Sequence, residues 1–234
     1  MEESGLIDRL IEFGLTRQEA ILYLALMRKG ELTGYEAAKE TGISRSNVYS
    51  ALAGLTDKGA AYIMEGAATR YVPVQVEEFC DNAMEKLKHD AEYLQSHMPQ
   101  KRIQTEGYIT IDGAAHIQDK IRHMIQNCEK RIYLAADRKQ ISVMEEQIRE
   151  AITRKIKTVI ITDEGCDIEG AITYHTKMVP GQLRLITDSA FVLTGEWSET
   201  EGDTCLYSGQ ENLITVFKEN LSNMIALIKI ENKN

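Results

Sequence analysis

The stretch around residue 45 is rich in side chains that can form hydrogen bonds with another polar macromolecule. If residues 44–58 form a helix, the face that points outward is small and polar and carries no long acidic side chain. Asparagine, serine and arginine can reach base edges and phosphate oxygens from a helix in the major groove of DNA. The residues that we expect to contact DNA from this helix are Arg45, Ser46, Asn47, Tyr49, Ser50 and Lys58.

Two helices joined by a tight turn would position that face. A short helix over residues 35–41 meets Gly42, which can adopt the left-handed conformation that ends a helix. Ile43 fills the corner, and Ser44 is a favourable N-cap for the second helix. The apolar face of the second helix has helical spacing and consists of Val48, Ala51, Leu52 and Leu55. This pattern is typical of a helix-turn-helix. A helical hairpin with a solvated polar face, or a module that binds another protein, is the alternative.

The flanking segments favour a winged helix over residues 1–75. An amphipathic helix over residues 6–13 comes first, and Thr16 and Glu19 form a capping box for the next helix. After Gly59 the pattern changes to two strands, residues 61–65 and 69–73, about a turn of small residues. This wing would offer Arg70 and Tyr71 to phosphate or to the minor groove, unless its role is only structural.

Residues 76–99 predict one long connecting helix, because the run contains neither glycine nor proline until Pro99. A narrow apolar stripe recurs at three- and four-residue steps: Val76, Cys80, Ala83, Leu87, Ala91, Leu94 and Met98. Such a seam on an exposed helix suits a coiled coil between two subunits, so we expect a homodimer. Packing of the helix on the chain's own carboxy-terminal domain is the other possibility.

Residues 100–234 alternate between strand and helix patterns. Strands are predicted at residues 108–111, 131–136, 158–162, 183–187, 190–194 and 204–207, the fourth and fifth forming a hairpin about Asp188 and Ser189. The fold class expected for the whole chain is an α+β winged helix-turn-helix, a long helix and an α/β layered domain.

The net charge of -9 argues against a protein that binds nucleic acid regardless of sequence. Residues 1–75 carry eight basic and ten acidic side chains, so most of the acidity lies outside the predicted DNA-binding unit. The four scattered cysteines indicate reduced thiols. No apolar run approaches the roughly 20 residues of a membrane span, and the amino terminus lacks a signal-peptide core, so we expect a cytoplasmic protein with no membrane partner.

The amino-terminal half resembles the TrmB family of transcriptional regulators. The resemblance covers residues 5–80 and is carried by GLTRQEAILYLALMRKGELTGYEAAKETGISRSNVYSALAGLTDKGAAY, followed by TRYVPVQVEEF. The later segments GYITIDGAAHIQDKIRHMIQNCEKRIYLAAD, KTVIITD and GQLRLITDSAFVLTGEW are similar to the effector domain of that family, which is related to the phospholipase D fold. The resemblance implies a regulator that binds a double-stranded DNA operator. It does not imply a sugar effector, because the chain is too short for the additional sugar-binding domain of larger members.

The phospholipase D relationship raises an enzymatic alternative, a phosphodiesterase or nuclease that uses His175 and Lys177. In that chemistry an HxK motif supplies a histidine that attacks phosphorus and a lysine that holds the phosphate oxygens. The acid expected a few residues later is replaced by Gln182, and Glu196 would repel a phosphate. We therefore expect no enzyme and no cofactor. Instead we expect a sensing cleft at strand ends, with His175, Lys177 and Asp188 binding a small-molecule effector.

Metal sensing is a third option for the same region. Its candidate ligands are Asp163, Glu164, Cys166, Asp167, Glu169 and His175. Their spacing fits no compact ligand set and acidic loops are usually solvated, so we expect no metal site.

Overall fold

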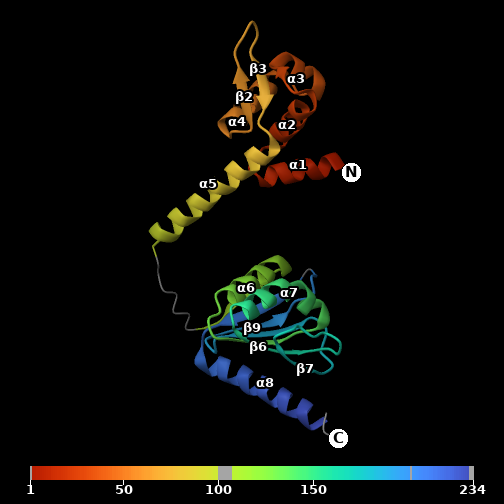
Figure 1. Ribbon diagram of the computed structural model, residues 1–234, viewed down its shortest axis with the longest axis vertical. Helices are drawn as coiled ribbons and strands as arrows, with labels where there is room; N and C mark the ends of the chain where they lie inside the picture. The colour runs from red at the N-terminus through yellow and green to blue at the C-terminus, as the bar shows by residue number, and fades with distance from the viewer. Residues whose placement is uncertain (1, 100–106, 201, 232–234) are drawn as a thin grey trace. The chain divides into compact units, whose positions relative to one another are not determined.

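The computed structural model describes the chain except residues 1, 100–106, 201 and 232–234, and it divides into two compact units (Figure 1). The amino-terminal unit is Met1–Lys101 and the carboxy-terminal unit is Arg102–Asn234. Within the described part of the chain, no helix combines the length and the apolar character needed to cross a membrane.

The amino-terminal unit is a winged helix that continues into a long helix. Its elements are α1 (Glu2–Glu12), α2 (Arg17–Lys29), β1 (Leu32–Thr33), α3 (Gly34–Thr41), α4 (Arg45–Asp57), β2 (Ala61–Met64), β3 (Arg70–Pro73) and α5 (Val76–His97). The three strands form an antiparallel sheet in the order β1-β3-β2. The two-residue strand β1 was not predicted, because it is too short to show an alternating pattern.

Local signals fix the helix ends. The predicted capping box is confirmed, since the Thr16 hydroxyl accepts from the amide of Glu19 and the Glu19 carboxylate accepts from the amide of Thr16. Gly42 has a φ of 71° and ends α3 as predicted. The predicted cap at Ser44 is wrong in detail, because no described backbone amide of α4 donates to its hydroxyl, which lies 3.3 Å from the hydroxyl of Ser46.

The start of α5 is built into the core of this unit. The Tyr23 hydroxyl donates to the Val74 carbonyl at 2.8 Å, just before the helix begins. The Phe79 ring is buried, with its centroid 5.7 Å from that of Tyr23. On the adjacent turn of α5, the Glu78 carboxylate accepts from the Tyr62 hydroxyl of β2. These contacts hold the beginning of α5 to the helices and to the wing.

The carboxy-terminal unit is a seven-stranded mixed sheet with helices on both faces. Its elements are β4 (Ile109–Asp112), α6 (Ala114–Gln126), β5 (Arg131–Ala135), α7 (Arg138–Thr153), β6 (Lys157–Thr162), β7 (Ile172–His175), β8 (Gln182–Thr187), β9 (Phe191–Glu196), β10 (Thr204–Ser208) and α8 (Glu211–Glu231). The strand order is β4-β10-β9-β8-β5-β6-β7. Strands β5, β6 and β7 are parallel, and the remaining pairs are antiparallel.

Each face of this sheet has its own core. Helices α6 and α7 cover one face, where Ile121, Ile132 and Ile148 are buried together. Helix α8 covers the other face, where Ile161 and Leu221 are buried together. The predicted hairpin is confirmed, because β8 and β9 pair about Asp188 and Ser189, each with a φ of 54° that suits a tight hairpin turn.

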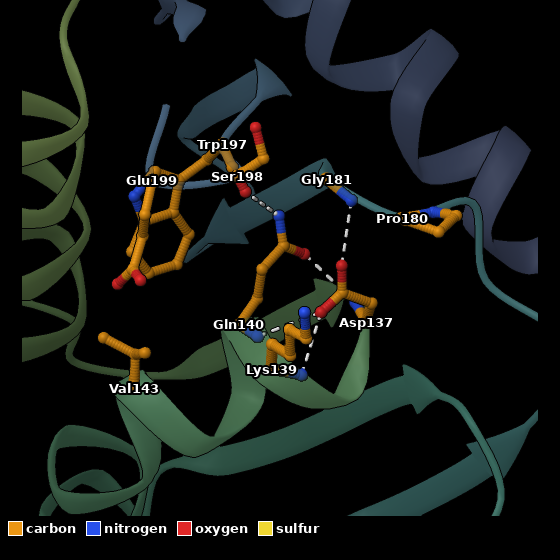
Figure 2. Close-up of a pocket in the computed structure, with 9 residues that line it drawn as sticks. All are labelled: Asp137, Lys139, Gln140, Val143, Pro180, Gly181, Trp197, Ser198 and Glu199. Carbon is orange, nitrogen blue, oxygen red and sulfur yellow. Dashed lines mark hydrogen bonds between the residues drawn. The ribbon is translucent and has the colours of Figure 1, made fainter. Parts of the chain in front are cut away.

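A cavity of about 170 Å³ lies at the edge of the sheet where β5 ends (Figure 2). Its wall comes from three connections: the turn into α7, the turn into β8 and the segment after β9. The lining residues are Asp137, Lys139, Gln140, Val143, Pro180, Gly181, Trp197, Ser198 and Glu199. The carboxyl edge of parallel strands is where α/β domains tend to bind ligands. The sequence indicated that edge but not this set of residues.

Candidate nucleic-acid interface

The outward face of α4 is open to solvent. Arg45, Ser46, Asn47 and Ser50 are exposed, whereas the apolar face of the helix is buried as predicted. The first turn of α4, every residue of which the structure describes, carries no acidic side chain. A neutral and basic surface of this kind can approach phosphates without repulsion.

An aromatic side chain that we did not predict extends this face. The Arg45 guanidinium carbon lies 4.9 Å from the ring centroid of Tyr35, which is 57% exposed. The neighbouring Tyr49 is 54% exposed, and its ring packs over Gly34, where an added Cβ would lie 2.5 Å from Tyr49 Cε1. The position of the Tyr49 ring therefore depends on a glycine at the start of α3.

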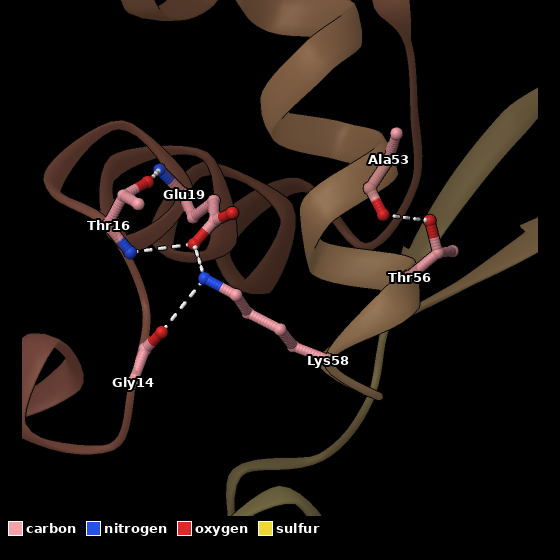
Figure 3. A network of polar contacts seen from close by, with 6 residues as sticks. All are labelled: Gly14, Thr16, Glu19, Ala53, Thr56 and Lys58. Atoms are coloured by element: carbon pink, nitrogen blue, oxygen red, sulfur yellow. Dashed lines mark hydrogen bonds and ion pairs between the residues drawn. The ribbon is translucent and has the colours of Figure 1, made fainter.

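The ammonium group of Lys58 is bound within the unit and is not free to contact DNA. This finding corrects its predicted role as a DNA contact. Its Nζ donates to Glu19 Oε2 at 2.6 Å and to the Gly14 carbonyl at 2.9 Å (Figure 3). The Glu19 side chain is only 8% exposed, and a Cβ on Gly54 would collide with its Oε1. The pair joins the end of α4 to the beginning of α2, so it holds the recognition helix in place.

The Glu19 carboxylate is kept ionised by these neighbours. Burial raises the pKa of Glu19, but the hydrogen bonds from Lys58 and from the Thr16 amide outweigh burial, and the pKa lies below its ordinary value. An ionised carboxylate at this depth needs its ammonium partner.

The wing does not present the two side chains that we predicted. Arg70 Nη1 lies 3.2 Å from Glu31 Oε1 and 3.6 Å from Glu36 Oε2, so its charge is balanced within the unit. Tyr71 is only 9% exposed and belongs to the core, and its predicted role as a DNA contact is therefore wrong. It faces inward because alternate residues of β3 point to opposite faces of the sheet.

The predicted seam on α5 is exposed beyond its first turns. Three members of this seam, Leu87, Leu94 and Met98, are 64%, 54% and 60% exposed, and Met84, which was not part of the predicted stripe, is 52% exposed. Phe79 is the buried residue of this helix among those that the structure describes. Contiguous exposed apolar side chains of this kind are a common feature of surfaces that bind another chain.

The predicted effector residues do not form one site. His175 ends β7 opposite Thr162 of β6, at the carboxyl edge of the parallel strands. Asp188 follows β8 next to Arg131, at the beginning of β5 and thus at the opposite edge. Lys177 is exposed near His175. The expected cleft of His175, Lys177 and Asp188 is therefore wrong.

Asp188 instead stabilises a turn. Its Oδ1 accepts from the amides of Lys130 and Arg131 at 2.7 and 3.0 Å, and its Oδ2 accepts from the Glu129 amide at 2.9 Å. The buried Cys128 thiol donates to Oδ1 at 3.1 Å. Burial raises the pKa of Asp188, yet these hydrogen bonds lower it below its ordinary value. Because the oxygens already have donors, this carboxylate is not available to a ligand.

The candidate metal ligands are also used within the fold. Asp163 accepts from the backbone amides of Arg138 and Met178, and His175 Nε2 lies 3.1 Å from Asp167 Oδ1. Across the described residues, no group of three or more His, Cys, Asp or Glu side chains is arranged to hold a metal ion.

Comparison with known proteins assigns both units. Residues 10–77 match the family model described as sugar-specific transcriptional regulator TrmB. Residues 107–225, half of the chain, match the amino-terminal subdomain of the effector-binding domain (EBD) of the transcriptional regulator TrmB.

The chain is also similar to individual proteins. The uncharacterized protein YrhO of Bacillus subtilis is 28% identical over 68% of this chain and 59% of its own. The sugar-sensing transcriptional regulator TrmBL1 of Pyrococcus furiosus is 28% identical over 57% of this chain and 41% of its own. The solved structure of TrmBL2, an archaeal chromatin protein, is 21% identical, covers 96% of this chain and 98% of its own, and has a TM-score of 0.45. The chain thus spans about half the length of the first two relatives. It belongs to the TrmB family of transcriptional regulators.

Proposed function

We propose that this protein regulates transcription as a homodimer whose α4 helices enter the major groove of a specific operator. The observation that carries the proposal is the exposed first half of α4, where Arg45, Asn47 and Ser50 point outward with no acid in the first turn, which the structure describes in full. A winged helix alone contacts too few base pairs for strong specificity, and two related by symmetry would read two half-sites.

Selection of bound sequences from a random pool of duplex DNA tests this proposal. We expect a two-fold symmetric site. Asn47→Ala should cost about 1–3 kcal/mol and relax the preference at one position of each half-site, since asparagine reads base edges. Arg45→Ala should reduce the slope of affinity against salt by about one for each phosphate that the arginine neutralises. The exposed Lys88 of α5 provides the control substitution, Lys88→Ala. Unchanged affinity, selectivity and salt slope in both α4 variants would refute the proposed interface.

The dimer is proposed on the exposed seam of α5. Fully burying a side chain such as Leu87 is favourable by about 1.5–3 kcal/mol, so pairing several residues of the seam would favour association of two subunits. Leu87→Lys would place an uncompensated charge there and should produce monomers in sedimentation experiments. Ser96→Lys introduces the same charge on the other face of the helix and should leave the dimer intact. Equal sedimentation of wild type and Leu87→Lys would exclude this seam.

Supported by the match to an effector-binding subdomain, the carboxy-terminal unit is proposed to sense a small molecule. Ligand binding would change DNA affinity by a coupling of about 1–3 kcal/mol. In cells, a chain truncated after Pro99 should lose its response to the inducing condition. Retention of the full response would contradict the sensing role.

The phosphodiesterase alternative has less support. Both family models that match the chain describe transcriptional regulators, and so does the name of TrmBL1. The His175 ring is hydrogen-bonded to Asp167 and to the Asp163 carbonyl, so its nitrogens are engaged within the chain. Cleavage of a phosphodiester by the wild type that disappears in His175→Ala would revive this alternative.

A further inference from the structure

The cavity beside Trp197 has walls whose polar groups are mostly used within the fold. Asp137 Oδ1 accepts from the Lys139 and Gln140 amides, and its Oδ2 accepts from the Gly181 amide at 2.8 Å. The Gln140 side chain donates to the Trp197 carbonyl and accepts from the Asp137 amide (Figure 2). These bonds join three connections into a preformed wall, as expected of a ligand site.

Three polar groups of the wall have no partner among the described residues. The Trp197 side chain is 2% exposed, and its Nε1 is a buried donor without an acceptor. Lys139 and Glu199 are exposed, carry opposite charges and form no ion pair within the part of the chain that the structure describes, and both line the cavity. Figure 2 shows their side chains on opposite sides of Gln140. The indole nitrogen is enclosed by protein atoms, so Lys139 and Glu199 are the charged groups of the wall that a ligand can reach.

We propose that this cavity binds a small zwitterion with an apolar body, of the size of an aliphatic α-amino acid. The ligand ammonium group would face Glu199, its carboxylate would face Lys139, and its apolar part would contact Val143. This inference names the ligand class for the sensing role proposed above and rests on it.

The volume limits the size of the ligand. A cavity of about 170 Å³ corresponds to roughly six water molecules at about 30 Å³ each. A ligand of about ten non-hydrogen atoms therefore fits. The charges limit the class of ligand further, because Glu199 would repel a simple anion and Lys139 would repel a simple cation.

Trp197 is the sole tryptophan of the chain, so its fluorescence reports on the cavity directly. The full-length protein without DNA is titrated with L-leucine, and the titration is repeated by calorimetry. We expect saturable binding with a Kd on the order of 0.1–1 mM, as for a ligand of this size. The analogues 4-methylpentanoate, which lacks the amine, and 3-methylbutylamine, which lacks the carboxylate, should bind at least tenfold more weakly. No saturation by either method up to 20-fold above about 1 mM, or binding of D-glucose in preference to leucine, would overturn the proposal.

Three substitutions test whether the ligand binds between Lys139 and Glu199. Lys139→Met and Glu199→Gln keep most of each side chain and should each weaken leucine binding by about tenfold or more. Lys177→Met removes an exposed ammonium group that lies outside the cavity wall and should leave the Kd unchanged. The opposite pattern, with loss only in Lys177→Met, would overturn the assignment.

Titrations with operator DNA distinguish a failure of the leucine site from a failure of the proposed regulatory function. A change of about 5- to 150-fold in operator affinity with leucine supports both. Leucine binding without any change in DNA affinity supports the site and contradicts the sensing role. Normal operator binding by a protein that binds no leucine overturns the site and leaves the DNA-binding role intact.

Discussion

Replacing Lys58 with methionine is expected to destabilise the amino-terminal unit by leaving the Glu19 carboxylate without its cation. Breaking a fully buried ion pair costs about 3–5 kcal/mol. Here the Lys58 side chain is 38% exposed and the Glu19 side chain 8% exposed, so water screens part of the interaction. The capping hydrogen bond from Thr16 also remains. We therefore expect a loss of about 2 kcal/mol at pH 7, smaller than for a fully buried pair.

Hydrogen exchange followed by mass spectrometry measures this loss in the full-length protein. A loss of about 2 kcal/mol corresponds to a roughly 30-fold decrease in protection for the amides of α2 and α4 that open together. Lys39→Met, at an exposed position on α3, is the matched control and should change protection by less than about twofold, as is usual for a surface substitution. Peptides from the carboxy-terminal unit should not change. Protection in α2 equal to that of the wild type would refute the structural role of Lys58.

The pH dependence gives a second readout. The pKa of Glu19 is lowered in the folded state, so its contribution to stability is present above the unfolded pKa of about 4.3. That contribution is lost as the pH falls through the folded pKa. A protonated Glu19 does not need an ammonium partner, so the difference in urea midpoint between wild type and Lys58→Met should narrow below about pH 4. A difference that stays constant down to pH 3 would mean that lost packing, and not lost charge, is the cause.

The remaining predictions concern Asp188, Gly34 and Arg70. Asp188→Asn should destabilise the carboxy-terminal unit by about 2 kcal/mol at pH 7, measured by urea unfolding with Trp197 fluorescence, because charged acceptors of amide hydrogen bonds contribute more than neutral ones. Since the pKa of Asp188 is lowered, that difference should be present above about pH 4 and disappear at lower pH; a constant difference would contradict it. Gly34→Ala should displace the Tyr49 ring and weaken operator binding, and unaltered affinity would remove this ring from the interface. Arg70→Ala should leave the salt slope of DNA binding unchanged, whereas a slope lower by about one would restore Arg70 as a phosphate contact.

Periodicity in the sequence predicted most helices and strands, because local spacing records which face of an element is apolar. The periodicity did not predict β7 (Ile172–His175), because the residues of this strand are exposed or only partly buried and do not alternate as in a typical strand. Tyr71 points inward while its neighbours Arg70 and Val72 are less buried, as the two-residue period of a strand requires. The run from Arg70 to Pro73 has no alternation of polar and apolar residues, so the sequence did not show this direction.

Side-chain partners were harder to predict than elements. Lys58 is 39 residues from Glu19, and Asp188 is 57 to 59 residues from the amides that it accepts from. No local pattern encodes such pairings. The wall of the cavity likewise combines Asp137, Gly181 and Trp197 from three separate connections, and only the strand order brings them together.

The attachment of α5 to its core makes the helix a lever with a fixed end. Phe79 and Glu78 hold the first turn to the winged helix, and about 18 residues extend beyond it. At 1.5 Å per residue this arm is roughly 27 Å long. A rotation of the winged helix by about 10° would therefore displace the far end of a stiff α5 by about 5 Å, a distance of roughly one helical turn. In the proposed dimer, the spacing of the operator half-sites and the register of the two α5 helices along the seam would therefore depend on each other. A shift of the seam by one helical turn would change the angle at which each winged helix meets the DNA.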